Sequence, residues 1–310
     1  MKTAATARKR NKTWSKILQN YDLYIFLLPA VLLTFCFTYI PMYGIVMAFQ
    51  DFTPSQGVFG SPWVGLEHFR RFFSSYQAKN LIINTLALSI YGMVATFPLP
   101  IVLALMLNQM KALKFKKTLQ TITYMPHFIS IVVVVSMLNI FLSPSTGLYG
   151  NICRLIGVEP MNLMGTADAF RSIYVWSDVW QHTGWDSVIY LAALAAVDPT
   201  LYEAATVDGA SRLKKMIHID FPSILPTCTI LLILRVGGLM GVGFDKAFLM
   251  QNALNTTKSE IISTYTYKVG IVSAQYSFSA AVGLFNTIID FILLVSVNAI
   301  SRKLSDNSLW

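Results

Sequence analysis

The sequence predicts an all-α, polytopic membrane protein with six transmembrane helices. Apolar residues make up 55% of the 310 residues and charged residues only 13%, about half of the ~25% that soluble domains carry. Mean hydropathy is +0.55, and several apolar runs reach the roughly 20 residues that a helix needs to cross the bilayer core. Two soluble domains, which the length alone would suggest, are excluded because too few charges remain to solvate their surfaces.

The six candidate spans occupy residues 23–49, 81–107, 119–142, 172–197, 224–244 and 280–300. The first two runs contain no charged residue, and the third contains a block of β-branched residues. The fifth contains a single charge, Arg235, and the sixth contains Asp290. Four polar residues interrupt the fourth run, but its second half is apolar enough to continue a span. These four residues are Asp178, Gln181, His182 and Asp186.

Basic residues predict the orientation of the chain. An even number of spans puts both termini on one side, where fifteen Lys and Arg then lie, against eight on the other side. Because cytoplasmic loops are enriched in Lys and Arg, residues 1–22 and 302–310 are expected to be cytoplasmic tails. The basic N-terminal stretch is not a cleaved signal, since the apolar run after it is as long as a span and lacks a small-residue cleavage site. The net charge of +9 is therefore mainly a topology signal.

Three segments on the outer side, 51–80, 143–171 and 245–277, are rich in aromatic residues or in glycine and proline. Aromatic residues gather where a membrane meets water, so an interfacial belt explains them. A docking surface for a partner outside the cell is the alternative.

The inner segment over 198–222 has the pattern of a helix-turn-helix. Asp198 can cap a short helix whose first residue is Pro199, and Gly209 supplies a turn that tolerates a left-handed backbone. A second short helix with an apolar stripe follows the turn. Pro222 is expected to end it before the fifth span begins. By itself, this pattern also fits a loop that packs against its own bundle.

The same segment carries a family signature. Glu203-Ala204-Ala205, Asp208-Gly209-Ala210, Ile219 and Pro222 resemble, with matching spacing, the EAA motif of permeases from binding-protein-dependent ABC importers. Two positions depart mildly from the motif, since Met216 stands for an aromatic residue and Phe221 for a leucine. Segments 124–130, 180–194 and 265–270 resemble permeases of oligosaccharide and polysaccharide importers, the group of the alginate importer's first permease. The resemblance covers about residues 20–303 and implies the type I ABC-importer permease fold.

The resemblance implies that the chain is one subunit of an ATP-driven importer in the bacterial cytoplasmic (inner) membrane. A second, homologous permease would share the pathway, two ATPase subunits would bind the EAA loop, and an extracytoplasmic binding protein would deliver a saccharide. The residues implied in coupling to the ATPases are Glu203, Ala204, Ala205, Asp208, Gly209, Ala210 and Pro222. ATP and Mg²⁺ would belong to the partner ATPases, because this chain has no GxxxxGK[ST] sequence. It is expected to bind no cofactor and to be no enzyme.

Polar groups inside a span are costly in lipid and are functional candidates for that reason. Arg235 and Asp290 have opposite charges and can pair, or Arg235 can face the translocation cavity and meet an anionic sugar. The aromatic and hydrogen-bonding groups of the fourth span suit a saccharide, but they suit an interfacial belt equally. The candidates for the substrate path are Trp176, Trp180, His182, Trp185, Arg235 and Asp290.

Other classes of function find less support. An intramembrane enzyme acting on lipid or glycan needs converging acid, base or metal groups, whereas the histidines and cysteines are scattered, without HExxH or CxxC. No metal site is expected. A self-sufficient channel or ion-driven carrier has no use for an ATPase-docking loop. The alternative is an ABC permease for another solute, a peptide or a sugar phosphate, because in this family the external binding protein does much of the selecting.

Overall fold

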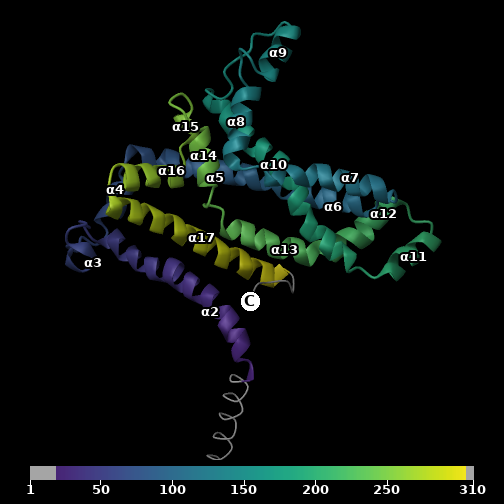
Figure 1. The fold of residues 1–310 in the computed structure, drawn as a ribbon, viewed down its shortest axis with the longest axis horizontal. Helices are drawn as coiled ribbons and strands as arrows, with labels where there is room; N and C mark the ends of the chain where they lie inside the picture. Colours follow the sequence, from purple (N-terminus) through teal and green to yellow (C-terminus); the bar gives the residue numbers. More distant parts are fainter. Residues whose placement is uncertain (1–18, 305–310) are drawn as a thin grey trace, which may run out of the picture.

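A computed structural model describes residues 19–304, and in that range the chain is helical apart from its connecting loops and one isolated β-bridge (Figure 1). This confirms the predicted all-α class. The tails predicted over 1–22 and 302–310 lie largely outside the described residues.

Four continuous helices of the described range are long and apolar enough to cross a membrane. The first consists of α2 (Tyr21–Thr34), a π turn (Phe35–Tyr39) and a 3₁₀ helix (Ile40–Phe49). The second joins α5 (Tyr76–Thr96) to α6 (Pro98–Asn108). The third joins α12 (Arg212–Lys215), a π turn (Met216–Asp220) and α13 (Phe221–Gly237), and the fourth is α17 (Tyr276–Leu304).

Two bent pairs supply the other candidate spans. α7 (Leu113–Tyr124) and its 3₁₀ turn (Met125–Phe128) meet α8 (Ile131–Phe141) at 98°. α10 (Ala167–Ala195) meets α11 (Pro199–Val207) at 77°. The described residues therefore contain four continuous candidate spans, or up to six when each bent pair counts as one.

The remaining helices are short. They are α3 (Gly57–Gly60), α4 (Glu67–Phe73), α9 (Leu148–Leu155), α14 (Phe244–Met250), α15 (Thr256–Ser259) and α16 (Ile262–Tyr267), which a π turn (Lys268–Val272) extends.

The run predicted as one continuous span over 119–142 is sharply bent. Pro126 lies in the 3₁₀ turn, and Ser130 caps a new helix with its side chain, which accepts a hydrogen bond from the Val133 N–H at 3.4 Å. Proline removes a helical hydrogen bond and a serine N-cap favours a fresh start. Apolarity over the whole run did not reveal the bend.

The helix that leads into the predicted fifth span also differs from expectation. Pro222 does not end it, because the helix runs without interruption from Arg212 to Gly237. In the π turn before Pro222, the Phe221 N–H bonds to the Met216 carbonyl, which shifts the hydrogen-bond register where proline lacks a donor. The helix then stops at Gly237, earlier than the expected end at 244, where a glycine-rich stretch follows.

Helix α10 is the centre of the packing. It lies against α5, α6 and α13, while α13 and the 3₁₀ helix over 40–49 pack on α17. Three buried apolar clusters hold these contacts. The one that matters for the site joins α6, α10 and α13 through Ile101, Ala104, Leu105, Tyr190, Leu194, Ile224 and Cys228.

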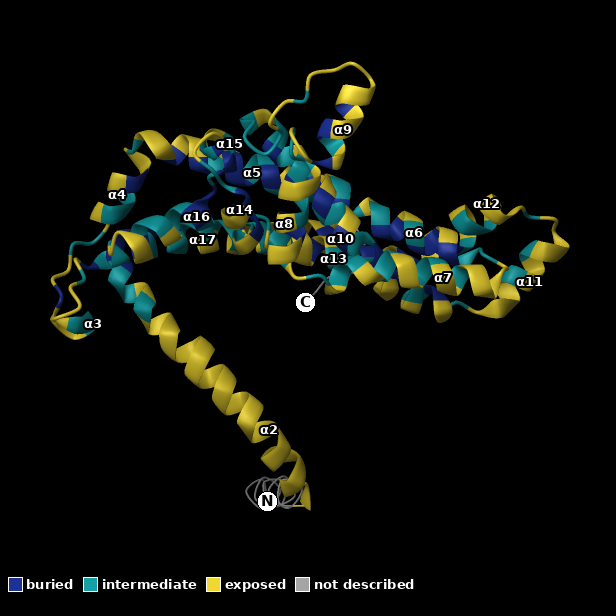
Figure 2. Cartoon of the chain, turned by 45° about the horizontal axis from the view of Figure 1, so that its top comes forward, coloured by how far each residue is buried: buried dark blue, intermediate teal, exposed yellow. Residues whose placement is uncertain are grey.

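Much apolar surface is exposed in the isolated chain. No residue of α2 is buried, and Figure 2 shows this helix extending away from the rest of the molecule. Apolar side chains facing outward are expected where lipid or another membrane subunit is the neighbour, since lipid tails solvate them.

Candidate functional site

The segment with the EAA residues begins as a helix fixed by its own sequence. Asp198 stands at the N-cap of α11, and its carboxylate accepts a hydrogen bond from the Thr200 N–H at 2.9 Å. This bond lowers the pKa of Asp198 below its usual value. Pro199 takes the first helical position, where its fixed φ suits the helix and its missing N–H leaves no bond unmade.

The end of α11 is equally specific. Gly209 has a φ of +71°, its N–H donates to the Thr206 carbonyl at 3.1 Å, and the Ala210 N–H donates to the Ala205 carbonyl at 2.8 Å. These two bonds form the Schellman motif, in which a left-handed glycine stops a helix. The Asp208-Gly209-Ala210 part of the motif is therefore the sequence that reverses the chain after α11.

The helix α11 lies at one end of the molecule, together with α12 (Figure 1). Glu203, Ala204, Asp208, Gly209 and Pro222 are exposed, while Ala205 and Ala210 are half-buried. Val207 beside them is 89% exposed and Leu213 is 62% exposed. Exposed apolar side chains next to two carboxyl groups form a surface that suits a protein partner with complementary basic groups.

The opposite side of α11 is anchored to the bundle by a cluster that we call the Asp220 clasp, made of Asn108, Gln109, Tyr202 and Asp220. Asp220 has no exposed surface, and its carboxylate accepts hydrogen bonds from Tyr202 Oη at 2.5 Å, Asn108 Nδ2 at 3.1 Å and Gln109 Nε2 at 2.5 Å. Burial and the hydrogen bond to Asp220 raise the pKa of Tyr202 to about 12, so its hydroxyl is a donor at neutral pH. Sequence reasoning missed this cluster because its members come from distant segments.

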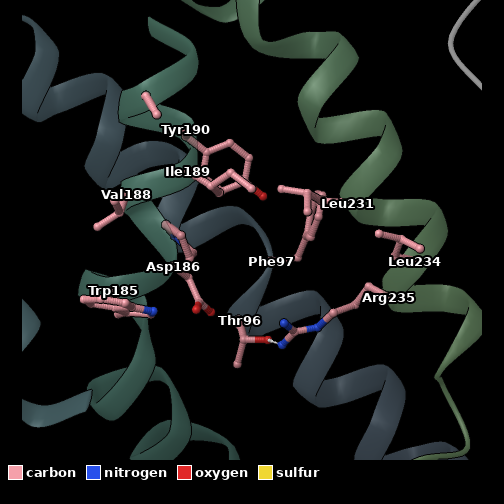
Figure 3. A pocket seen from close by; sticks show the side chains of 12 residues that line it. Thr96, Phe97, Trp185, Asp186, Val188, Ile189, Tyr190, Leu231, Leu234 and Arg235 are labelled. Atoms are coloured by element: carbon pink, nitrogen blue, oxygen red, sulfur yellow. Dashed lines mark hydrogen bonds between the residues drawn. The ribbon is translucent and has the colours of Figure 1, made fainter. Parts of the chain in front are cut away.

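A cavity of about 610 Å³ lies between α10 and α13, against the break that separates α5 from α6 (Figure 3). Thr96 at the end of α5 and Phe97 in the break line it on one side. On the other sides, α10 contributes Trp185 and Asp186, and α13 contributes Arg235. Most of the remaining wall is apolar. Its volume lies within the roughly 300–1,000 Å³ of small-molecule sites, which combine apolar walls with a few polar groups.

Arg235 faces this cavity and donates a hydrogen bond to Thr96 Oγ1. Figure 3 shows its side chain reaching toward Thr96, with the Asp186 carboxyl directed into the same space. Arg235 also borders a second hollow of about 350 Å³, which shares Thr96 and Leu234 with the first. The guanidinium group therefore stands where two hollows meet.

The pairing of Arg235 with Asp290, one of two predicted alternatives, does not occur. Asp290 accepts a hydrogen bond from the Met240 N–H at 2.8 Å, in the glycine-rich turn that follows α13, and it lines neither hollow. A backbone N–H left without a helical partner is a ready donor to a carboxylate. Asp290 thus holds the end of α13 in place.

The aromatic candidates of α10 lie on different faces. Trp185 lines the main cavity and stacks on His127, with ring centroids 4.8 Å apart. Trp176 donates to Tyr91 Oη at 2.9 Å. Trp180 borders a separate hollow against α6 and α7. Because Trp176 and Trp185 are about two and a half helical turns apart, they point in opposite directions, and the structure places only Trp185 at the cavity with Arg235.

His182 belongs to a charged cluster on the cavity side of α10. It lies 3.3 Å from Asp178, which also contacts Lys246 of α14 at 3.3 Å. Lys246 is only 4% exposed, and the sequence analysis gave it no role. Among residues 19–304, no group of three or more His, Cys, Asp and Glu could hold a metal ion.

A helical membrane protein with an exposed helical loop at one end, and a partly polar cavity between its helices, has the architecture of a transport subunit. Comparison with known proteins identifies the family. Residues 96–306 match the family of binding-protein-dependent transport system inner membrane components, and the chain belongs to this family. Membership confirms the family that the EAA motif predicted. It also confirms the prediction that the chain is a membrane transport subunit and not an enzyme.

Similar proteins extend over nearly the whole chain. The polygalacturonan/rhamnogalacturonan transport system permease YteP of Bacillus subtilis is 41% identical, covering 97% of this chain and 94% of its own. Protein LplB of the same organism is 39% identical over 98% and 96%. A solved chain of a bacterial ABC transporter that imports the acidic polysaccharide alginate matches with a TM-score of 0.87 and 38% identity, over 95% of this chain and 99% of its own. The fold is that of an ABC-importer permease.

Proposed function

We propose that this chain is the permease subunit of an ATP-driven importer for an oligosaccharide or polysaccharide, and that it forms the pathway together with a second, homologous permease. The observation that carries the proposal is the exposed EAA segment on α11, joined through α10 to the cavity that contains Arg235. The relatives support the class of solute, since YteP serves polygalacturonan and rhamnogalacturonan and the solved relative serves alginate.

The partners follow from the same surface. Two ATPase subunits bind ATP and Mg²⁺, and one of them binds α11 of this chain, with Glu203 and Asp208 meeting basic groups. A solute-binding protein delivers the saccharide to the opposite face. A second solved chain supports this partner, because it comes from the alginate transporter in complex with its pentasaccharide-bound periplasmic protein, with a TM-score of 0.87 and 37% identity over 96% of this chain and 99% of its own.

Both termini and α11 lie on the cytoplasmic side of the bacterial inner membrane in this proposal. The supporting observation is the distribution of basic residues, of which fifteen lie on that side and eight on the other. Lys and Arg accumulate in cytoplasmic loops, and an ATPase that uses cytosolic ATP reaches α11 only there.

The solute is an acidic oligosaccharide. Arg235 offers the cavity a guanidinium group, which binds carboxylates with paired hydrogen bonds, and the Trp185 ring provides a flat face for sugar C–H groups. Alginate, carried by the solved relative, is an acidic polysaccharide, and polygalacturonan is built from uronic acids.

The test is to express the chain with its cognate second permease, ATPase and binding protein, and to purify the assembly through a tag on this chain. We expect stoichiometric recovery of the ATPase, and ATP hydrolysis that rises when the binding protein carries galacturonate oligosaccharides but not maltooligosaccharides. Failure to recover any ATPase would contradict the proposed class of protein. Stimulation by the neutral oligosaccharide alone would contradict the acidic solute.

A further inference from the structure

The Asp220 clasp connects three helices at one point. Asp220 is the last residue of the π turn that leads into α13, Tyr202 lies on α11, and Asn108 and Gln109 end α6. Asn108 Nδ2 also lies 3.3 Å from Tyr202 Oη, so the donors contact each other as well as the carboxylate. One side chain therefore binds the EAA helix to two membrane helices.

Burying a carboxylate has a free-energy cost that packing of the helices does not require. A fully buried carboxylate loses its hydration, and hydrogen bonds or an ion pair must offset that loss. Here three donors surround the carboxylate, and no Lys or Arg forms an ion pair with it within the described part of the chain. The apolar cluster of α6, α10 and α13 already packs these helices together next to it. The clasp adds a directional link between them and α11.

The helices that the clasp joins also reach the cavity. Arg235 lies on α13, and Thr96, to which it donates, is the last residue of α5, directly before the break that leads into α6. α13 is thus tied at two points, to the end of α6 through Asp220 beside the EAA helix, and to the end of α5 through Arg235 beside the cavity. A displacement of α11 is passed to both cavity walls if the clasp stays closed.

We propose that Asp220 is a positioning residue that makes α11, α6 and α13 move as one unit, so that an ATPase pulling on α11 changes the cavity around Arg235. This inference rests on the proposed function, since it requires an ATPase on α11. Within that function, the inference assigns the transfer of motion from α11 to the membrane helices to the buried carboxylate of Asp220. Asp220 is not one of the EAA residues expected to face the ATPase.

A single hydroxyl group offers the sharpest test. Tyr202→Phe removes the bond between α11 and Asp220 but keeps the ring and its packing. Tyr265→Phe is the matched control, because Tyr265 packs in a different cluster, with Phe278. Each variant is purified as the complete complex, reconstituted in liposomes, and measured for oligosaccharide uptake and ATP hydrolysis in the same preparation.

We expect Tyr202→Phe to assemble normally and to keep hydrolysing ATP, while uptake per ATP falls about tenfold, the factor expected for one hydrogen bond to a charged group. Tyr265→Phe should leave this ratio unchanged. A merely structural role would lower uptake and hydrolysis together, through the amount of intact complex. An unchanged ratio in Tyr202→Phe would therefore overturn the inference.

A double-mutant cycle provides the second measurement. Gln109→Met removes another bond to Asp220, on the side of α6. If both residues act through Asp220, the double variant should lose little more coupling than either single variant, because contacts within one network are not additive. Fully multiplied losses would contradict action through the shared carboxylate. If the unmodified complex showed no ATP-dependent uptake, the proposed function itself would be wrong. That outcome is distinguishable from an unchanged ratio in Tyr202→Phe, which overturns only the inference.

Discussion

At the scale of single residues, Gly209 shows how an EAA residue can be required for backbone reasons alone. Its φ of +71° lies in the left-handed region, and a Cβ built on it would meet open space. Glycine is therefore required here by the backbone conformation and not by steric crowding. A side chain in this region costs about 1–2 kcal/mol.

The first prediction concerns this glycine. Gly209→Pro fixes φ at the wrong sign and deletes the N–H that bonds to Thr206, so α11 should lose its Schellman end. We expect the protein to reach the membrane at normal levels while uptake is lost, with Gly209→Ala intermediate. Gly283→Ala is the control, because a Cβ there also meets open space and its φ is ordinary. Normal uptake by Gly209→Pro would show that the shape of this turn is irrelevant to coupling.

The second prediction concerns Arg235. Arg235→Gln removes the charge but keeps a donor for Thr96, so the helices should stay together while an acidic solute loses its partner. Uptake of galacturonate oligosaccharides should fall about tenfold to a hundredfold, the range for a hydrogen bond to a charged group. Thr96→Val, which removes only the protein partner of Arg235, should have a smaller effect. Equal uptake by Arg235→Gln and the unmodified protein would remove Arg235 from the solute path.

At the scale of elements, the sequence specified α11 well because its determinants are local. Asp198, Pro199 and Gly209 act on their own neighbours, so the cap, the start and the turn could be derived without any tertiary contact. The family resemblance rested on residues of the same short segment, Gly209 among them. Caps and turns of this kind form from neighbouring residues and do not depend on tertiary contacts.

Elements that depend on distant partners could not be predicted in this way. One wrong expectation was local: the helix after the turn continues through Pro222, where a π turn shifts the hydrogen-bond register. Arg235 and Asp290 have opposite charges, but their helices direct them to Thr96 and to the Met240 N–H. The Asp220 clasp joins positions 112 residues apart, for which a single sequence carries no signal.

The third prediction tests a helix crossing. Gly184 of α10 lies against α7 so closely that an added Cβ would overlap the Thr123 carbonyl. Small residues let membrane helices approach in this way. Gly184→Val should force α10 away from α7, destabilise the protein by about 1–3 kcal/mol or more, and lower both its yield and its melting temperature. Gly283→Ala, whose added Cβ meets open space, should retain both. An unaltered melting temperature in Gly184→Val would contradict this close approach.

At the scale of the whole molecule, the main feature is the small number of charged residues. Few charged groups lie among the helices, and several of them have specific contacts, such as Lys246 with Asp178 and Asp290 with Met240. The exposed apolar surface of α2 and the exposed EAA surface on α11 both fit a subunit whose neighbours are lipid and other proteins. The two functional regions lie in one connected group of helices, which is what an energy-coupled pathway requires.

The most direct measurement of the central claim, that α11 is where the ATPase binds, is site-specific cross-linking in intact membranes. A photoreactive maleimide is attached at Val207→Cys, where the native side chain is 89% exposed, or at Phe59→Cys on α3, where it is 93% exposed. The helices α3 and α11 lie at opposite ends of the molecule (Figures 1 and 2). Cys36, the exposed native cysteine, is first replaced by serine. We predict that the probe at 207 cross-links the ATPase subunit in a nucleotide-dependent manner and that the probe at 59 does not. No ATPase cross-link from 207, or an equal one from 59, would contradict the account.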